Sequence, residues 1–572
     1  MKPAALLLSI LFSILPSSAQ QLAQEKPPEK CVVEGTVVAA ATGEPLKKAR
    51  LALMKAESRD FGRDRPYTAS SDASGRFLLR EVEPGRYRLR VERDGYVGQE
   101  YGERRSGRMW ERRGAILTLL PGQKLGDIVF RMIPAAVITG RVYDTDGEPL
   151  PGARVTALRY GYSRGQRQLL PEEFAQTNDL GEYRIYGLPP GSYYVSALYT
   201  ENQRWITGRI AISGEGAETN EGYVPTYYPG TSNESQAVPL EVRPGDELRG
   251  IDFALLAARA VRIRGRVFNT ITGKPGRGVM LWLTSTEPMG RFPFDRDFVQ
   301  EDDGTFELRG VQPGSYVLMA QWMQENKRYT ARQEVEVGST DIEGISLVIG
   351  PGIEILGRLR VEGAAVSGGA GSAEKKGEQP PDITEYRIWL EPRVFVPLGQ
   401  ASATVKADGA FVLENVAADD YEVRVFNAPP EAFVKSARLG GEDVLEEGLR
   451  VTGPVRGTLE VVVSLNGAVV DGAVTKDGQA FSGATVALVP EGRRRERPQL
   501  FKTTTTDQYG RYTLRGISPG EYKVFAWEGI EPGAYQDPAF LRSYEEQGQE
   551  VRLTEGSRTT LELKLIPASQ EQ

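Results

Sequence analysis

The sequence contains no histidine and only one cysteine, Cys31. Histidine is the usual proton shuttle at neutral pH and the commonest metal ligand. Its absence excludes Ser-His and Cys-His nucleophile activation and every zinc site that contains imidazole. A single cysteine forms neither an intramolecular disulfide nor a four-cysteine metal site. We therefore expect a protein that is not an enzyme, with no catalytic residues, no metal site and no cofactor.

The chain also lacks an excess of positive charge and long apolar runs. Its 70 Lys and Arg residues stand against 77 Asp and Glu residues, for a net charge of −7 and a pI near 5.4. A field of this sign does not favour a polyanion, so nucleic acid is not an expected partner. No later segment reaches the roughly 20 uncharged apolar residues of a membrane span, so no transmembrane segment is expected.

The N-terminus is typical of an export signal. Lys2 is followed by an apolar stretch from Ala4 to Leu15, and Pro16-Ser17-Ser18-Ala19 ends in small residues. This pattern predicts a signal peptide over residues 1–19, with cleavage after Ala19. We expect the protein to be exported and to reside in the periplasm, at the outer membrane or outside the cell.

One phrase recurs five times along the chain. Examples are SDASGRFLLREVEPGRYRLRV, TNDLGEYRIYGLPPGSYYVSA and TDQYGRYTLRGISPGEYKVFA. The anchoring tyrosines of the five copies are Tyr87, Tyr193, Tyr316, Tyr421 and Tyr522. Their spacing of about 100 to 120 residues is the size of one β-sandwich.

Each phrase predicts two strands joined by a turn. The Asp-Gly opening favours a hairpin turn, and the aromatic residue after it begins a strand. Pro-Gly then reverses the chain into a second strand, in which Tyr87, Leu89 and Val91 alternate with Arg88 and Arg90. This period of two places the tyrosine face in the core and the arginine face in solvent.

These patterns predict an all-β protein, a tandem array of five immunoglobulin-like or transthyretin-like β-sandwich modules without long helices. The predicted division is a signal peptide (1–19), a linker (20–30), five modules (31–134, 135–258, 259–350, 351–465 and 466–567) and a tail (568–572). The fourth module is degenerate and carries a predicted disordered insertion at 362–381, rich in Gly, Ala, Ser, Lys and Glu.

The repeats resemble the bacterial carboxypeptidase regulatory-like domain. The shared pattern is G-x-V, then G-x-P-L-x-G-A-x-V, then T-D-x-x-G-x-Y-x-L-x-x-[VL]-x-P-G-x-Y, and the second copy matches it best with TDGEPLPGARV and TNDLGEYRIYGLPPGSYYV. The fourth copy departs from it, with Ala417-Ala418-Asp419 in place of Pro-Gly. The resemblance implies a transthyretin-like sandwich, grouped with carbohydrate-binding folds. The zinc peptidase domain that the family name suggests is absent.

Two loops are candidates for ligand binding, because aromatic faces at the ends of sandwiches can stack on sugar rings. They are GQEYGERRSGRMWERRG in the first repeat and EGYVPTYYPGTSNES in the second. The predicted ligand contacts are Tyr101, Arg104, Arg105, Arg108 and Trp110 in the first loop, and Tyr227 and Tyr228 in the second. An acidic glycan is the expected ligand of the arginine-rich loop. The alternative is that the tyrosines pack over a sandwich edge and the arginines form a solvated rim.

A further basic run, EGRRRERP, contains Arg493, Arg494, Arg495 and Arg497. We interpret it as an exposed hairpin tip rather than a polyanion site.

Three functions fit the sequence. The first is an exported, non-catalytic carbohydrate-binding or adhesion protein of the bacterial cell envelope. The second is a structural or assembly spacer of the envelope, and the third is an accessory subunit of a peptidase or outer-membrane transporter. The expected partner is a glycan or another envelope protein.

Overall fold

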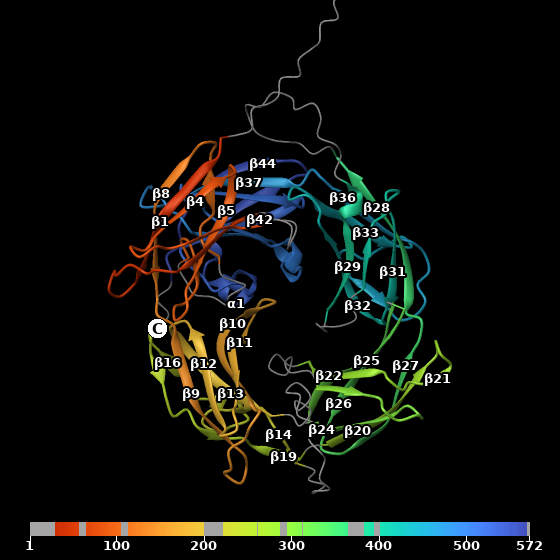
Figure 1. Ribbon diagram of the computed structural model, residues 1–572. Coiled ribbons are helices and arrows are strands. Elements are labelled where there is room, and N and C mark those ends of the chain that lie inside the picture. Colours follow the sequence, from red (N-terminus) through yellow and green to blue (C-terminus); the bar gives the residue numbers. More distant parts are fainter. Residues whose placement is uncertain are drawn as a thin grey trace, which may run out of the picture.

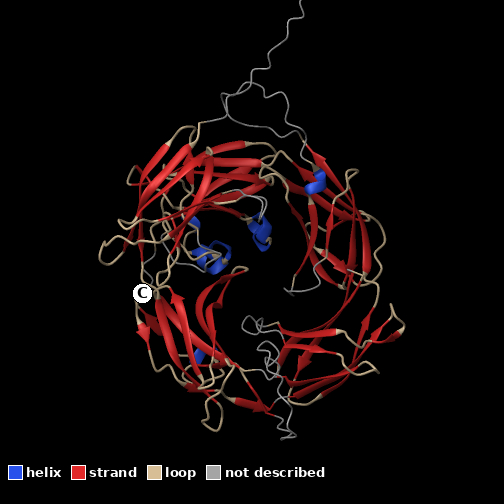
Figure 2. Cartoon of the chain, viewed as in Figure 1, coloured by secondary structure: helices blue, strands red, loops and turns tan. Residues whose placement is uncertain are grey.

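The computed structural model describes residues 29–56, 65–103, 113–199, 221–259, 261–286, 295–311, 313–325, 327–363, 382–393 and 401–568. Within these ranges the regular secondary structure is almost entirely β-strand, which confirms the predicted all-β class (Figure 2). The longest described helix is α1 (Pro538–Arg542). The predicted signal peptide, and the predicted insertion from residue 364 onward, lie outside the described residues.

Five pairs of sheets are described, each enclosing its own hydrophobic cluster. The first sheet pair contains β1 (Cys31–Ala39), β2 (Arg50–Lys55), β3 (Tyr67–Ser70), β4 (Arg76–Val82), β5 (Gly85–Glu92), β6 (Gln99–Glu100), β7 (Leu117–Leu119) and β8 (Lys124–Met132). The second contains β9 (Ala136–Tyr143), β10 (Arg154–Ser163), β11 (Gln166–Gln176), β12 (Glu182–Leu188), β13 (Gly191–Leu198), β15 (Thr226–Tyr227), β16 (Leu240–Val242), β17 (Glu247–Leu248) and β18 (Phe253–Ala254).

The remaining sheet pairs follow in chain order. A two-stranded ribbon of β14 (Glu221–Tyr223) and β19 (Ala257–Arg259) leads into the third. The third sheet pair contains β20 (Val261–Asn269), β21 (Lys274–Pro275), β22 (Met280–Ser285), β23 (Asp295–Phe298), β24 (Thr305–Val311), β25 (Gly314–Gln324), β26 (Lys327–Val337) and β27 (Ile342–Ile349).

The fourth sheet pair contains β28 (Ile353–Glu362), β29 (Arg387–Pro392), β30 (Ser402–Thr404), β31 (Ala410–Val416), β32 (Asp419–Phe426), β33 (Phe433–Leu439), β34 (Glu442–Asp443), β35 (Leu449–Val451) and β36 (Leu459–Ser464). The fifth contains β37 (Ala468–Lys476), β38 (Gln479–Ala480), β39 (Thr485–Pro490), β40 (Lys502–Thr505), β41 (Arg511–Ile517), β42 (Gly520–Trp527), β43 (Gln549–Leu553) and β44 (Arg558–Lys564). The module boundaries given by the sequence stay a prediction.

Short helical turns complete the described structure. They are η2 (Glu234–Gln236), η3 (Ile383–Glu385), η4 (Gly492–Glu496), η5 (Pro498–Leu500), η6 (Ala534–Gln536) and η7 (Glu545–Gln547).

The opening strand of each sheet pair has the same neighbours. β1, for example, runs antiparallel to β4 and parallel to β8. In all five pairs the glycine of the Gly-x-Val element (Gly-x-Leu in the fourth) lies opposite the aromatic residue that follows the glycine-containing turn: Gly35 with Phe77, Gly140 with Tyr183, Gly265 with Phe306, Gly357 with Phe411 and Gly472 with Tyr512. A Cβ atom at Gly357 would overlap the Phe411 ring, so the ring occupies space that only glycine leaves.

The anchoring tyrosines point inward, in agreement with the strand register that the repeats predict. Tyr87, Tyr193, Tyr421 and Tyr522 are at most 2% exposed, and Tyr316 is half-buried against the third core. The hydroxyls of the four fully buried tyrosines each donate a hydrogen bond to the backbone carbonyl four residues earlier in the chain. The hydroxyl of Tyr193, for example, donates to the carbonyl of Pro189 at 2.8 Å. The tyrosine therefore fills the core and also satisfies a carbonyl at the preceding turn.

The five sheet pairs are arranged in a ring, with the first beside the fifth (Figure 1). Arg332 on β26 forms an ion pair with Asp419 on β32, joining the third pair to the fourth. Glu555 in the fifth pair accepts from Ser464 at 2.6 Å and pairs with Lys435 at 3.0 Å, both in the fourth. The chain is thus closed on itself rather than extended as a row.

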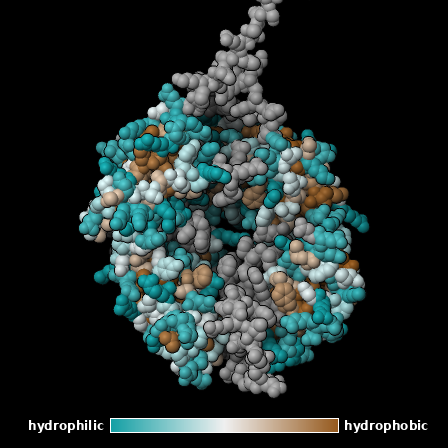
Figure 3. Space-filling view, in the orientation of Figure 1, coloured by the Kyte–Doolittle hydropathy of each residue, from teal (hydrophilic) through white to brown (hydrophobic). Residues whose placement is uncertain are grey.

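The surface is predominantly hydrophilic on the face shown in Figure 3, where hydrophobic residues form separate small patches and the middle of the ring is hollowed. No helix among the described residues has the length and apolar character needed to cross a bilayer.

Candidate functional site

A cavity of about 610 Å³ opens on the inner side of the ring, between the first, second and fifth sheet pairs. This volume lies within the roughly 300–1,000 Å³ of small-molecule sites. Its basic lining residues are Arg86, Arg88, Arg113, Arg164, Lys502 and Arg515, and its acidic ones are Glu528 and Glu531. Six basic side chains against two carboxylates make the cavity electropositive in a protein of net charge −7.

The cavity depends on contacts that join the first sheet pair to the fifth. Ile116 forms a parallel β-bridge with Asp507. Thr505 Oγ1 donates to the carbonyl of Gly114 at 2.7 Å, and both residues are buried. Segments almost 400 residues apart in the chain therefore form adjacent walls of one site.

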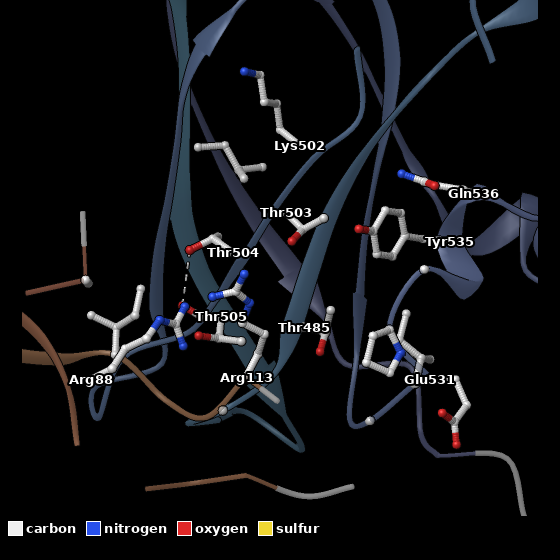
Figure 4. A pocket seen from close by; sticks show the side chains of 18 of the residues that line it. Arg88, Arg113, Thr485, Lys502, Thr503, Thr504, Thr505, Glu531, Tyr535 and Gln536 are labelled. Atoms are coloured by element: carbon white, nitrogen blue, oxygen red, sulfur yellow. Dashed lines mark hydrogen bonds between the residues drawn. The ribbon is translucent and has the colours of Figure 1, made fainter. Parts of the chain in front are cut away.

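The floor of the cavity is β40, an edge strand. One edge of β40 pairs with β39. Its other edge is covered only from Thr505 onward, where Gly114 and Ile116 of the first sheet pair contact it. Its earlier part, Lys502 to Thr504, borders the cavity. Figure 4 shows the threonines of this strand between Arg88 and Arg113 on one side and Tyr535 and Gln536 on the other. The cavity is thus lined by both hydroxyl and charged groups.

The second sheet pair reaches the cavity through the hairpin of β10 and β11. The ring of Tyr162 near the hairpin tip lies 6.1 Å from that of Phe540 in the fifth pair. A Cβ atom at Gly165 would lie 2.7 Å from the carbonyl oxygen of Gln536, so the hairpin tip packs closely on the fifth pair. Arg164 donates to the carbonyl of Arg393 in the fourth pair. The hairpin therefore connects the second sheet pair to the fourth and the fifth.

Arg88 is held by an ion pair in the cavity wall. Its Nη1 lies 3.2 Å from Glu100 Oε2 and donates to the carbonyl of Gly114 at 3.1 Å. Burial lowers the pKa of the guanidinium, Glu100 opposes this shift, and Arg113 adds to it. The charge of Arg88 is balanced, whereas Arg113 lies exposed at the cavity edge.

Lys502 has a different environment. It is half-buried, and desolvation lowers its pKa, with a smaller contribution from Arg424. Within the described residues no carboxylate contributes to its electrostatic environment. The ammonium group is thus a partly desolvated cation that has no carboxylate partner among the described residues.

The predicted contacts in the first loop fall in two classes. Tyr101 is half-buried, and its ring packs edge-on against Phe130 at 6.1 Å, as part of the first core. Arg104, Arg105, Arg108 and Trp110 lie outside the described residues. Arg113, which follows them in the sequence, lines the cavity, and the assignment of the first loop as a ligand contact stays a prediction.

The predicted contacts in the second loop pack against protein. Tyr227 is 5% exposed and lies in a cluster with Leu158 and Leu169. Tyr228 packs edge-on against Phe253 at 6.1 Å. Neither residue lines the cavity. Their assignment as ligand contacts stays a prediction.

EGRRRERP lies in the connection between the antiparallel strands β39 and β40, so its interpretation as part of a hairpin tip agrees with the structure, but the expectation that it is exposed is wrong. The segment forms η4 and η5, and only Arg493 among its four arginines is exposed. Arg495 forms a bidentate ion pair with Glu545, at 2.8 and 3.1 Å. Arg497 pairs with Glu446 of the fourth sheet pair at 2.9 Å. Ion pairs with acidic residues that are distant in the sequence therefore hold this basic segment against the protein surface.

The cavity residues of β40 were not found from the sequence. The run Lys502 to Thr506 has high β propensity, but nothing in it distinguishes a binding wall from an ordinary edge strand. The cavity forms because the first sheet pair contacts the fifth. The repeated sequence pattern does not specify which sheet pairs contact each other.

Comparisons with known proteins agree with the fold. Residues 32–119 and 137–220 match the family model of the carboxypeptidase regulatory-like domain, a non-catalytic domain type. No curated protein matches the sequence.

Three solved structures with local similarity are the following. The TIE protein of Bacillus anthracis is 14% identical, with 56% of this chain and 51% of that chain covered and a TM-score of 0.15. A minor pilin of Streptococcus agalactiae is 11% identical, with 39% and 94% covered and a TM-score of 0.21. The major pilin subunit of Bacillus cereus is 10% identical, with 56% and 99% covered and a TM-score of 0.14. The chain thus spans about half the length of the first of these.

Proposed function

Since the chain carries two tandem carboxypeptidase regulatory-like domains, we propose that it is an exported, non-catalytic carbohydrate-binding protein of the cell envelope. Its ligand site is the cavity between the first, second and fifth sheet pairs. The signal-like N-terminus supports export, and the absence of histidine argues against the common hydrolytic mechanisms.

The observation that carries this proposal is the composition of the cavity wall. Thr485, Thr503 and Thr504 supply hydroxyls, and Tyr535 supplies an aromatic face beside them. Sugars are recognised by polar groups that bond their hydroxyls and by aromatic rings that pack against their faces. The edge of β40 also borders the cavity, where backbone groups can bond a ligand.

A glycan array probed with the full chain tests the proposal. We expect selective binding to a subset of glycans, and loss of that binding in Thr503→Trp, where an indole fills the cavity. Thr503 is exposed on β40, so the substitution leaves the core unchanged. Thr554→Trp is the matched control, because Thr554 is exposed in the same sheet pair and does not line the cavity.

The array also separates this function from an assembly role. Absence of binding above background on the whole array would refute the proposal and favour a protein that pairs with another envelope component. Binding that Thr503→Trp and Thr554→Trp leave equally intact would place the glycan site elsewhere on the molecule.

A further inference from the structure

We propose that the cavity selects a saccharide carrying carboxylate groups, bound along β40 with one carboxylate near Lys502 and another near Arg113. This inference rests on the proposed function, because it names the ligand class of the same cavity.

The first argument is the uncompensated charge of Lys502. Buried or partly buried cations are normally paired. The nearby Arg424 is already engaged by Glu391 at 2.8 Å and Glu422 at 3.1 Å, and no described carboxylate pairs with Lys502. A carboxylate on the ligand would supply the missing counter-charge at little cost in protein rearrangement.

The second argument is the charge at the other end of the strand. Glu100 balances Arg88, whereas none of the ion pairs within the described part of the chain includes Arg113. Arg113 immediately precedes Gly114, whose carbonyl accepts the hydrogen bond from Thr505. A second cation is therefore positioned at the end of β40 opposite Lys502.

The third argument is the spacing between these cations. Lys502 and Thr505 are the ends of a four-residue strand, so their Cα atoms lie roughly 10 Å apart at the usual rise, and Figure 4 shows the side chains of Lys502 and Arg113 toward opposite ends of this strand. A single small anion does not bridge that distance, but a linear saccharide with acidic groups on successive rings does. Thr503 and Thr504 lie between the two ends and both line the cavity, and they offer one hydroxyl on each face of the strand to a sugar.

Calorimetric titration of the full chain with tetragalacturonate tests the inference. Its fully methyl-esterified form is the matched ligand, because it has the same rings without charge. We expect the acid to bind at least about tenfold more tightly than the ester.

Two variants locate the charge effect. Lys502→Met should weaken binding of the acid by about tenfold and leave that of the ester unchanged. Arg493→Gln removes one exposed charge from the same sheet pair outside the cavity, and it should change neither. Thermal unfolding of Lys502→Met should show a folded protein at least as stable as the wild type, since the substitution removes a desolvated cation.

Each other outcome has a definite meaning. Equal binding of acid and ester, blocked by Thr503→Trp, would overturn the carboxylate inference and preserve the proposed function. Absence of acid binding, or acid binding unaffected by Lys502→Met, would also overturn the inference. If inorganic phosphate displaces the saccharide and binds with the same affinity, the cavity recognises anions in general and not a saccharide. Failure of every glycan on the array would refute the proposed function itself.

Discussion

Gln508 and Thr118 are 390 residues apart in sequence and form two reciprocal hydrogen bonds. The amide of Thr118 donates to Gln508 Oε1 at 2.9 Å, and Gln508 Nε2 donates to the carbonyl of Thr118 at 2.7 Å. A side-chain amide thus replaces a strand partner at the junction between the first and fifth sheet pairs. This junction closes the ring and completes the cavity.

Gln508→Ala should weaken the junction. Loss of two hydrogen bonds, one to a backbone donor and one to a backbone acceptor, should lower the free energy of unfolding by about 1 to 3 kcal/mol. Differential scanning calorimetry of the full chain measures the change. Gln547→Ala is the control, because Gln547 is exposed in the same sheet pair, and its effect should stay within about 0.5 kcal/mol. Equal effects of the two substitutions would show that the junction does not form in solution.

Tyr193 should contribute through both its ring and its hydroxyl. Tyr193→Phe removes the 2.8 Å bond to Pro189 and should cost about 1 kcal/mol. Tyr193→Ala also removes a fully buried ring and should cost about 3 to 5 kcal/mol. Denaturant unfolding gives both values. Tyr186→Phe, at a site 70% exposed in the same sheet pair, should be neutral, and a neutral Tyr193→Ala would mean that the strand register is wrong.

Gly265→Ala should destabilise the third sheet pair. The added Cβ would lie 2.6 Å from the Phe306 ring and would overlap the carbonyl oxygen of Ile345. Overpacking of this kind costs about 1 to 3 kcal/mol. Gly338→Ala in the same sheet pair meets no atom within 4 Å and should have little effect on thermal unfolding. If the two variants unfold at the same temperature, packing does not require a glycine at position 265.

The ion pairs of Glu545 should make stability depend on pH. Hydrogen bonds from Arg495 lower the pKa of this carboxyl from 4.5 to about 2, and Lys523 adds to the effect. Because the folded-state pKa is the lower one, the contribution is complete above about pH 4.5 and disappears as the pH falls toward 2. Glu545→Gln should therefore destabilise the protein at pH 7, by about 1 kcal/mol since the carboxylate is one-third exposed, and should approach the wild type near pH 2.

Unfolding of the two proteins across this pH range checks the prediction. Glu546→Gln, at an exposed neighbour, serves as the control and should parallel the wild type. A pH-independent difference between Glu545→Gln and the wild type would assign the effect to packing instead of charge.

The sequence predicted the features that rest on local periodicity. Alternation along the repeated phrase located the inward tyrosines, and the Asp-Gly and Pro-Gly turns located the strand ends. The pairing of Gly357 with Phe411 was not predicted, because strand pairing joins residues 54 positions apart and no local pattern specifies the partner.

The cavity was harder to predict, because contacts between residues distant in the sequence form it too. Aromatic and basic composition pointed to the loop containing Trp110, which lies outside the described residues, and of that sequence segment Arg113 lines the cavity. Lys502 gave no signal, because its importance comes from the missing counter-charge in the folded ring. The run from Arg493 to Arg497 was wrongly expected to be exposed, because its acidic partners, Glu545 and Glu446, lie about 50 residues away in the sequence.

Hydrogen–deuterium exchange with and without tetragalacturonate tests most directly whether ring closure builds a saccharide site. The account predicts that the ligand slows exchange together in residues 113–119 and 502–508, which are distant in sequence and adjacent at the cavity. Unchanged exchange in these two segments at saturating saccharide, or protection confined to another part of the ring, would contradict it.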